Sequence, residues 1–206
     1  MSSQLGGVDV SRETIQNLEH FAALVTKWTP KINLIAKGSV LDIWDRHIID
    51  SVQLYRFAPK AYEKWADLGS GGGFPGIILA ILAKEKQPNA HFTLIESDQR
   101  KSTFLRTAAR ELRLSITVIA ERIEQTAPLG ADVVSARALA PLPSLLPLVG
   151  RHMRDGGICL LHKGKQAAQE VADAKNDWSF DLEDHASMTD PEARLLIIQR
   201  ISARGK

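Results

Sequence analysis

Hydrophobic residues recur at helical spacing through the first sixty residues of the chain. One helix is predicted over residues 11–28, with Ser11 as its N-cap and Pro30 ending it. A second helix is predicted from about residue 40 to residue 55. The apolar stripes of the two helices comprise Leu18, Phe21, Val25 and Trp28 in the first, and Ile43, Trp44, His47, Ile48, Ser51 and Tyr55 in the second. The pattern predicts an N-terminal helical cap, residues 1–60, packed on the rest of the same domain.

From residue 65 onward, apolar runs of strand length alternate with helical patterns. The five predicted strands of this part are 65–68, 92–95, 116–119, 132–135 and 158–161. The helical patterns that follow them cover 76–84, 100–112, 122–126, 142–149 and 165–176. Two late strands, 180–185 and 195–201, are predicted to complete the sheet as an antiparallel pair. This alternation indicates an α/β fold in residues 61–206, with a mostly parallel seven-stranded sheet and helices on both faces.

The most specific feature of the chain is a glycine-rich turn between the first predicted strand and its helix. Asp67 ends the strand, glycines follow at positions 69, 71, 72 and 73, and Phe74-Pro75-Gly76 leads into the helix. A turn of this kind lets the backbone approach a nucleotide-like ligand, as in Rossmann-like folds. Gly71, Gly73 and Gly76 also fit the G-x-G-x-x-G spacing of dinucleotide binding, which is a weak signal alone.

Asp67 discriminates between two cofactor classes. A dinucleotide places a pyrophosphate at such a turn and favours the positive end of the helix dipole, so a carboxylate there would repel it. S-adenosylmethionine carries an ammonium group and a sulfonium and no phosphate, so a nearby carboxylate suits it. The alternative is that Asp67 only caps the turn through backbone N–H groups. The interpretation that we favour is cofactor contact by Asp67, made directly or through the turn.

The ends of the later strands supply further candidate ligand contacts, because ligands of such sheets bind beyond the carboxyl ends of the strands. Glu96, after the second strand, is placed to accept hydrogen bonds from both ribose hydroxyls, unless it is only an acid at a helix N-terminus. Backbone groups and the Ile123 side chain, after the third strand, could hold an adenine ring. Arg137, after the fourth, could bind a cofactor carboxylate, a substrate phosphate or a base edge, or form a surface ion pair. Lys163 and Lys165 flank a glycine after the fifth, where phosphate contact is plausible.

Composition narrows the setting of the protein. The 206 residues carry a net charge of +2, so a nucleic-acid surface would have to be a local patch. The single cysteine, Cys159, lies in an apolar run, which excludes an internal disulfide and fits a reducing cytoplasm. The six histidines lack zinc spacing, so no metal is expected. The N-terminus does not read as a signal peptide, and the longest apolar run, 77–83, is too short to cross a bilayer. We therefore expect a cytoplasmic protein.

Several segments together resemble one known family. They are 33–35 (Asn-Leu-Ile), 45–51 (Asp-Arg-His-Ile-Ile-Asp-Ser), 67–76, 135–138 (Ser-Ala-Arg-Ala) and 163–164 (Lys-Gly). In this order they resemble the bacterial small-subunit ribosomal RNA methyltransferases of the glucose-inhibited-division-protein-B type, which methylate a guanine at N7. The chain departs from the family at Ile78, where proline is frequent, inside a helix and away from the expected chemistry.

The resemblance implies a class I fold and S-adenosylmethionine contacts at Gly69, Phe74, Ile123, Glu124 and Arg137. Arg46, His47 and Asp50 match a family signature on the second helix, and we expect Arg46 and His47 to contact substrate. Alternatively, Arg46 and Asp50, one turn apart, only pair with each other, and His47 is a core residue.

The activity implied is methyl transfer to guanine N7 of 16S ribosomal RNA, presented as naked RNA, a small subunit or an assembly intermediate, by a protein expected to be a monomer. Guanine N7 carries no proton, so we expect no catalytic base and a mechanism of positioning. Two alternatives remain at this point. One is an NAD(P)-dependent oxidoreductase, and the other is a non-catalytic module that binds S-adenosylmethionine and RNA.

Overall fold

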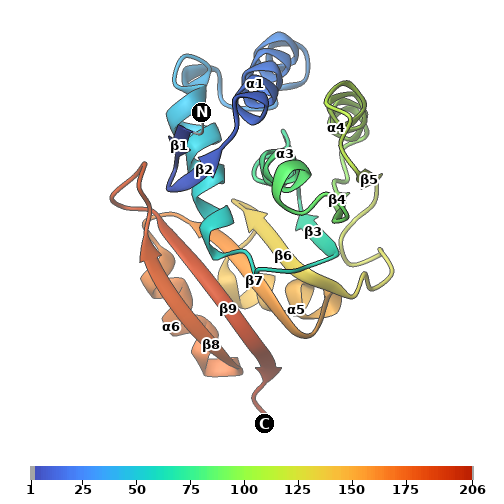
Figure 1. Cartoon of the computed structure of the whole chain (residues 1–206). Helices are drawn as coiled ribbons and strands as arrows, with labels where there is room; N and C mark the ends of the chain where they lie inside the picture. The colour runs from blue at the N-terminus through green and yellow to red at the C-terminus, as the bar shows by residue number, and fades with distance from the viewer. Residues whose placement is uncertain (1–2, 206) are drawn as a thin grey trace.

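The computed structural model describes residues 3–205 and is built around one seven-stranded sheet (Figure 1). Its strands are β3 (Lys64–Leu68), β4 (His91–Ile95), β5 (Ile116–Ile119), β6 (Ala131–Arg137), β7 (Met153–Lys163), β8 (Trp178–Ala186) and β9 (Arg194–Ala203). Their order across the sheet is β5-β4-β3-β6-β7-β9-β8. Neighbours from β5 to β7 are parallel, whereas β9 is antiparallel to both β7 and β8. The predicted mostly parallel sheet with a late antiparallel pair is confirmed.

Helices cover both faces of the sheet, because alternate strand residues are apolar on each side. Trp65 of β3 joins the hydrophobic cluster that contains α3 (Gly76–Lys86) and α4 (Gln99–Glu111). Its neighbour Ala66 joins the cluster of α5 (Leu142–His152), and Ala174 of α6 (Ala167–Asp177) belongs to the same cluster. Helix α3 is buried on all sides from Gly76 to Ala83, which explains why its sequence is apolar without a polar face.

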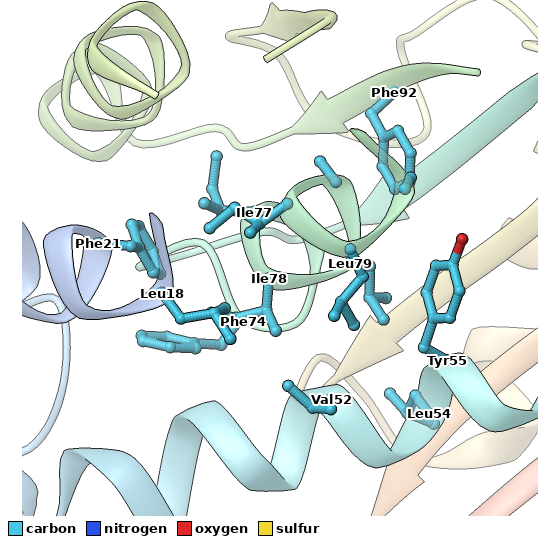
Figure 2. Close-up of a cluster of buried hydrophobic side chains, with 14 of the residues drawn as sticks. Leu18, Phe21, Val52, Leu54, Tyr55, Phe74, Ile77, Ile78, Leu79 and Phe92 are labelled. Carbon is cyan, nitrogen blue, oxygen red and sulfur yellow. The ribbon is translucent and has the colours of Figure 1, made fainter. Parts of the chain in front are cut away.

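The N-terminal helix α1 (Arg12–Ile32) packs on α3 and α4. Phe21 of α1 lies 5.4 Å from Phe74 and 6.2 Å from Phe104, measured between ring centroids. Figure 2 shows Phe21, Phe74 and the isoleucines of α3 meeting Val52 in one apolar cluster. The first sixty residues thus share a core with the sheet and its helices.

Two features of this N-terminal part differ from the sequence prediction. Helix α1 continues through Pro30 to Ile32, because a proline in the last turn removes only its own donor and the N–H of Asn33 still bonds the Thr29 carbonyl. A small hairpin, β1 (Ser3–Leu5) and β2 (Val8–Val10), precedes the helix and was not predicted. Its signal was the Gly6-Gly7 pair, whose positive φ angles of 54° and 78° suit a two-residue hairpin turn.

The second predicted helix, residues 40–55, is wrong as a single α-helix. The chain there forms η1 (Lys37–Ser39), the π-helical turn η2 (Trp44–Ile49), the short α2 (Asp50–Val52) and η3 (Gln53–Phe57). Side chains of η2 and α2 bond distant strands, and these tertiary bonds favour a widened turn that local periodicity does not reveal. Such π turns occur frequently at functional sites.

The predicted helix at 122–126 is also wrong. It is a single turn, closed by a 3.1 Å hydrogen bond from the Thr126 N–H to the Arg122 carbonyl. Arg151 takes the Thr126 carbonyl, and Pro128 follows, so the turn does not continue as a helix.

Candidate functional site

A cavity of about 470 Å³ opens at the carboxyl ends of the central strands. It lies where the strand order reverses, between β3 and β6, which is the ligand position expected in open α/β sheets. Its size falls within the range of about 300–1,000 Å³ that small-molecule sites occupy. We call it the first cavity.

The first cavity brings together most of the predicted cofactor residues. Its lining includes Gly69, Gly71, Phe74, Glu96, Ile123, Glu124 and Arg137. It also includes Leu34, Ile35 and Leu139, which the site prediction did not name. Residues 33–35 had been noted as one of the resembling segments, and this was the available signal for the first two. His47 also lines this cavity, although it was predicted as a substrate contact.

The glycine turn forms one wall of the first cavity. Gly69 and Gly73 have φ angles of +67° and +90°, which only glycine adopts without strain. The turn is closed by a 2.7 Å hydrogen bond from the Gly73 N–H to the Ser70 carbonyl. A Cβ atom on Gly69 would lie 2.6 Å from Leu139 Cδ1, so the bare backbone is what leaves room at this wall.

The carboxylate of Glu96 is fixed at the cavity by two backbone donors. Its Oε2 accepts a 2.8 Å bond from the Gly71 N–H, and its Oε1 accepts a 2.8 Å bond from the Asp98 N–H. Asp98, not Glu96, caps helix α4 by accepting from the N–H groups of Arg100 and Lys101. A carboxylate has about four acceptor sites, so Glu96 keeps capacity for hydroxyl groups of a ligand.

Asp67 lies beneath the turn instead of in the cavity. Its side chain is 0% exposed, and its Oδ1 accepts a 2.6 Å bond from Ser135 Oγ. Its Oδ2 has no hydrogen-bond partner among the described residues and sits under Gly76, at 2.5 Å from where a Cβ would be. Because no part of Asp67 reaches the cavity wall, direct cofactor contact is not available in this conformation. Any influence on a ligand passes through the turn.

Burial gives Asp67 a pH-dependent effect on stability. It raises the pKa of Asp67 to about 6, so from about pH 4 to about pH 6 the folded protein binds more protons here than the unfolded chain. This contribution to the free energy of unfolding falls as the pH rises through that window, by about 3 kcal/mol, and is constant above it.

Asp67→Asn removes this titration. We expect the stability of the variant relative to wild type to increase by about 3 kcal/mol between about pH 4 and about pH 7, measured by urea unfolding. Asp9→Asn, at an exposed position of β2, is the control and should show no such trend. A pH-independent difference between Asp67→Asn and wild type would contradict the assignment.

Arg137 lines the cavity but is tied to the π-helical turn. Its Nη2 donates to the Arg46 carbonyl at 3.0 Å and lies 3.1 Å from His47 Nδ1, and its Nη1 lies 3.4 Å from Asp50 Oδ2. The side chain is 19% exposed. The prediction of a simple surface ion pair between Arg46 and Asp50 is replaced by a half-buried pair between Arg137 and Asp50.

His47 is neutral near pH 7. Burial, with the charge of Arg137 as the next cause, lowers its pKa to about 4. Arginine has no acceptor, so Nδ1 of His47 accepts from Arg137 and the ring proton lies on Nε2, which donates to Ser39 Oγ at 3.0 Å. Both ring nitrogens are therefore engaged within the protein.

A second cavity of about 770 Å³ lies beside the first and shares the segment 137–140 with it. Asp50 lines it, is 4% exposed, and is held by Thr189 Oγ1 at 2.6 Å and His162 Nε2 at 2.7 Å. Burial alone would raise the pKa of Asp50, but the bond to His162 and the charges of His162 and Arg137 lower it.

The predicted substrate cations lie at or near the second cavity. Arg46 lines it, at the exposed side of the π-helical turn. Lys163 also lines it but is 7% exposed, with its Nζ 2.7 Å from Glu170 Oε2 and 2.5 Å from the Ala140 carbonyl. The expected phosphate contact by Lys163 is therefore not available here, because the ammonium group is already paired. Lys165 is exposed and lines neither cavity.

Two other site classes find no support in residues 3–205. No helix in this range combines the length and apolarity needed to span a membrane. Nor does this range bring together three or more histidine, cysteine, aspartate or glutamate side chains in an arrangement for a metal ion. Cys159 is fully buried, and burial raises the pKa of its thiol.

Fold and site together define the class of this protein. Five parallel strands, one reversed strand inserted before the last, and a glycine-walled cavity at the switch point are the architecture of class I S-adenosylmethionine-dependent methyltransferases. The chain resembles the structure of M. jannaschii TYW2 in complex with AdoMet, with a TM-score of 0.57 at 14% identity over 76–82% of each chain's range, specifically 82% of this chain and 78% of that one.

Sequence comparison identifies the family. The family model for GidB, rRNA small subunit methyltransferase G, matches residues 14–197. Ribosomal RNA small subunit methyltransferase G of Cereibacter sphaeroides is 50% identical over 200 residues, covering 97% of each chain. The relative of the same name from Ruegeria pomeroyi is 52% identical over 195 residues, covering 95% of each. The chain belongs to the GidB family of rRNA small subunit methyltransferases.

Proposed function

We propose that this chain transfers a methyl group from S-adenosylmethionine to N7 of a guanine in small-subunit ribosomal RNA. The observation that carries the proposal is the first cavity, walled by the glycine turn and Glu96, in a chain that matches the family over residues 14–197. The unpaired Asp67 carboxyl beneath the turn adds support, because it disfavours a pyrophosphate at the N-terminus of α3. This argues against the NAD(P) alternative.

The lining of the first cavity fits the cofactor. Glu96 would accept from the ribose hydroxyls, Ile123 would pack on the adenine, and the backbone of Gly69 and Gly71 would lie along the methionine portion. Phe74, Glu124 and Arg137 complete the proposed contacts, with Arg137 acting mainly as a wall because its terminal nitrogens are engaged. When bound, S-adenosylmethionine supplies an electrophilic methyl group.

Catalysis by this site is proposed to rest on positioning. Guanine N7 has an in-plane lone pair and no proton, so no side chain has to act as a base. His47, the histidine at the first cavity, fits this expectation, because it is neutral and its Nδ1 lone pair is taken by Arg137. Alignment of the acceptor and the methyl group can supply about 7–11 kcal/mol of barrier reduction.

Glu96 provides a direct test of cofactor placement. Glu96→Ala is expected to raise the dissociation constant for S-adenosylmethionine about tenfold or more, because charge-assisted bonds to the ribose are worth about 1.5–3 kcal/mol each. Isothermal calorimetry measures the constant. Glu19→Ala, at an exposed position of α1, serves as the control. An unchanged constant for Glu96→Ala would remove this residue from the site.

The function is tested with labelled cofactor. Purified protein is incubated with small-subunit particles that lack the modification, and in parallel with protein-free ribosomal RNA, followed by nucleoside mapping. Label at guanine N7 supports the proposal, and the comparison of substrates shows whether RNA alone or an assembled particle is used. Cofactor binding without transfer would favour a non-catalytic module. A monomer acting in the cytoplasm is part of the proposal, and the mass of the protein in solution tests the first of these.

A further inference from the structure

The two cavities are separated by a single short segment. Residues 137–140 line both of them, directly after strand β6. Within this segment Ala138 has a φ of +50°, a conformation that residues with a side chain rarely adopt. Backbone outliers of this kind persist where the surroundings hold them, and they cluster at active sites.

The surroundings of this segment hold it from both ends. At one end Arg137 is paired with Asp50, which is itself bonded by Thr189 and His162. At the other end the Ala140 carbonyl accepts from Lys163, which is paired with Glu170. The partition between the cavities is therefore a fixed element of the site.

We propose that the second cavity receives the target guanine of the RNA, so that N7 reaches the methyl group across the Arg137–Ala140 partition. This inference rests on the proposed function. The first cavity is taken by the cofactor, and the acceptor must approach the methyl from another direction. The second cavity is the one that shares the partition, and its volume of about 770 Å³ exceeds that of the cofactor site. A base unpaired from its RNA stack can enter such a pocket.

The charges of the second cavity suit a guanine base. Its two most buried cations, Arg137 and Lys163, are each neutralised by a carboxylate, so they do not form a phosphate site. Exposed carboxylates at Asp42, Asp45 and Asp190 line the same cavity. Carboxylates accept from the N1–H and amino groups of guanine, whereas adenine offers an acceptor at N1. They also favour the positive charge that the purine acquires when N7 is methylated.

A bulky side chain in the second cavity tests the assignment in the full-length protein. Gly164 lines the cavity, its φ lies outside the left-handed region, and a Cβ there would meet no described atom within 4 Å. Gly164→Phe thus adds volume without backbone strain. We expect its KM for small-subunit particles to rise about tenfold or more, with the dissociation constant for S-adenosylmethionine within about twofold of wild type.

Matched variants separate occupation of the cavity from general damage. Gly150→Phe lies on α5, lines neither cavity and also has open space, so both constants should stay near wild type. Gly164→Ala adds one methyl group and should behave likewise. If Gly164→Phe methylates as Gly150→Phe does, or loses cofactor affinity instead, the assignment is overturned. Absence of transfer by the wild-type protein would refute the proposed function itself.

A second measurement does not depend on methyl transfer. RNA that carries 6-thioguanosine at the mapped target position is irradiated with cofactor-free protein, and the attached peptides are identified. We expect crosslinks to residues 137–140 or 162–164, which line the second cavity. Crosslinks confined to segments that line neither cavity would overturn the assignment.

Discussion

Asp50→Ala is expected to lower the free energy of unfolding by about 3–5 kcal/mol, because removing one partner of a buried ion pair leaves uncompensated charge. Asp50 is 4% exposed and holds Arg137, His162 and Thr189, which come from β6, β7 and the loop between β8 and β9. Arg137 is partly exposed, so the lower end of this range is the better expectation. Urea unfolding followed by circular dichroism measures the change.

Two comparisons sharpen this prediction. Asp45→Ala, an exposed position on the same π-helical turn, should change stability by no more than about 0.5 kcal/mol. The pKa of Asp50 is lowered in the folded state, so its stabilising effect is present above the ordinary aspartate pKa and is lost as the pH falls below it. The difference between wild type and Asp50→Ala should therefore shrink below about pH 4. Equal effects of Asp45→Ala and Asp50→Ala would contradict the network.

Gly73→Ala is expected to destabilise the protein by about 3–5 kcal/mol, through backbone strain and crowding together. The φ of Gly73 is +90°, and a Cβ would lie 2.7 Å from Ile77 Cγ1 and 2.8 Å from Phe21 Cζ. Phe21 and Ile77 are fully buried in the cluster shown in Figure 2, so neither has room to move. Because Phe74 follows directly and lines the first cavity, binding of S-adenosylmethionine should weaken as well.

Gly130→Ala isolates the backbone part of this effect. Gly130 also has a positive φ, +59°, but a Cβ there would meet no described atom within 4 Å. We expect a cost of about 1–2 kcal/mol for this variant, measured by the same unfolding assay. The remaining difference is the packing cost at Gly73. Similar losses for the two variants would show that crowding at the glycine turn is relieved by movement.

The cofactor side of the site could be predicted largely from local sequence. Glu96 and the glycine turn follow directly from strands, and carboxyl ends of parallel strands converge at one edge of a sheet. The roles of Asp67 and Lys163 could not be predicted this way. Whether their charged groups face a cavity depends on Ser135 and Glu170, which lie on distant parts of the chain.

The sequence by itself determined the seven strands, the position of the glycine turn and the family, because alternating periodicity and a dense motif are local properties. Only the tertiary structure decided the π-helical turn at Trp44–Ile49, the pairing of Arg137 with Asp50, and the second cavity beyond the 137–140 segment. These features arise where buried charges from separate strands and helices satisfy one another. Burial and long-range pairing set their geometry, and neither leaves a periodic trace along the chain.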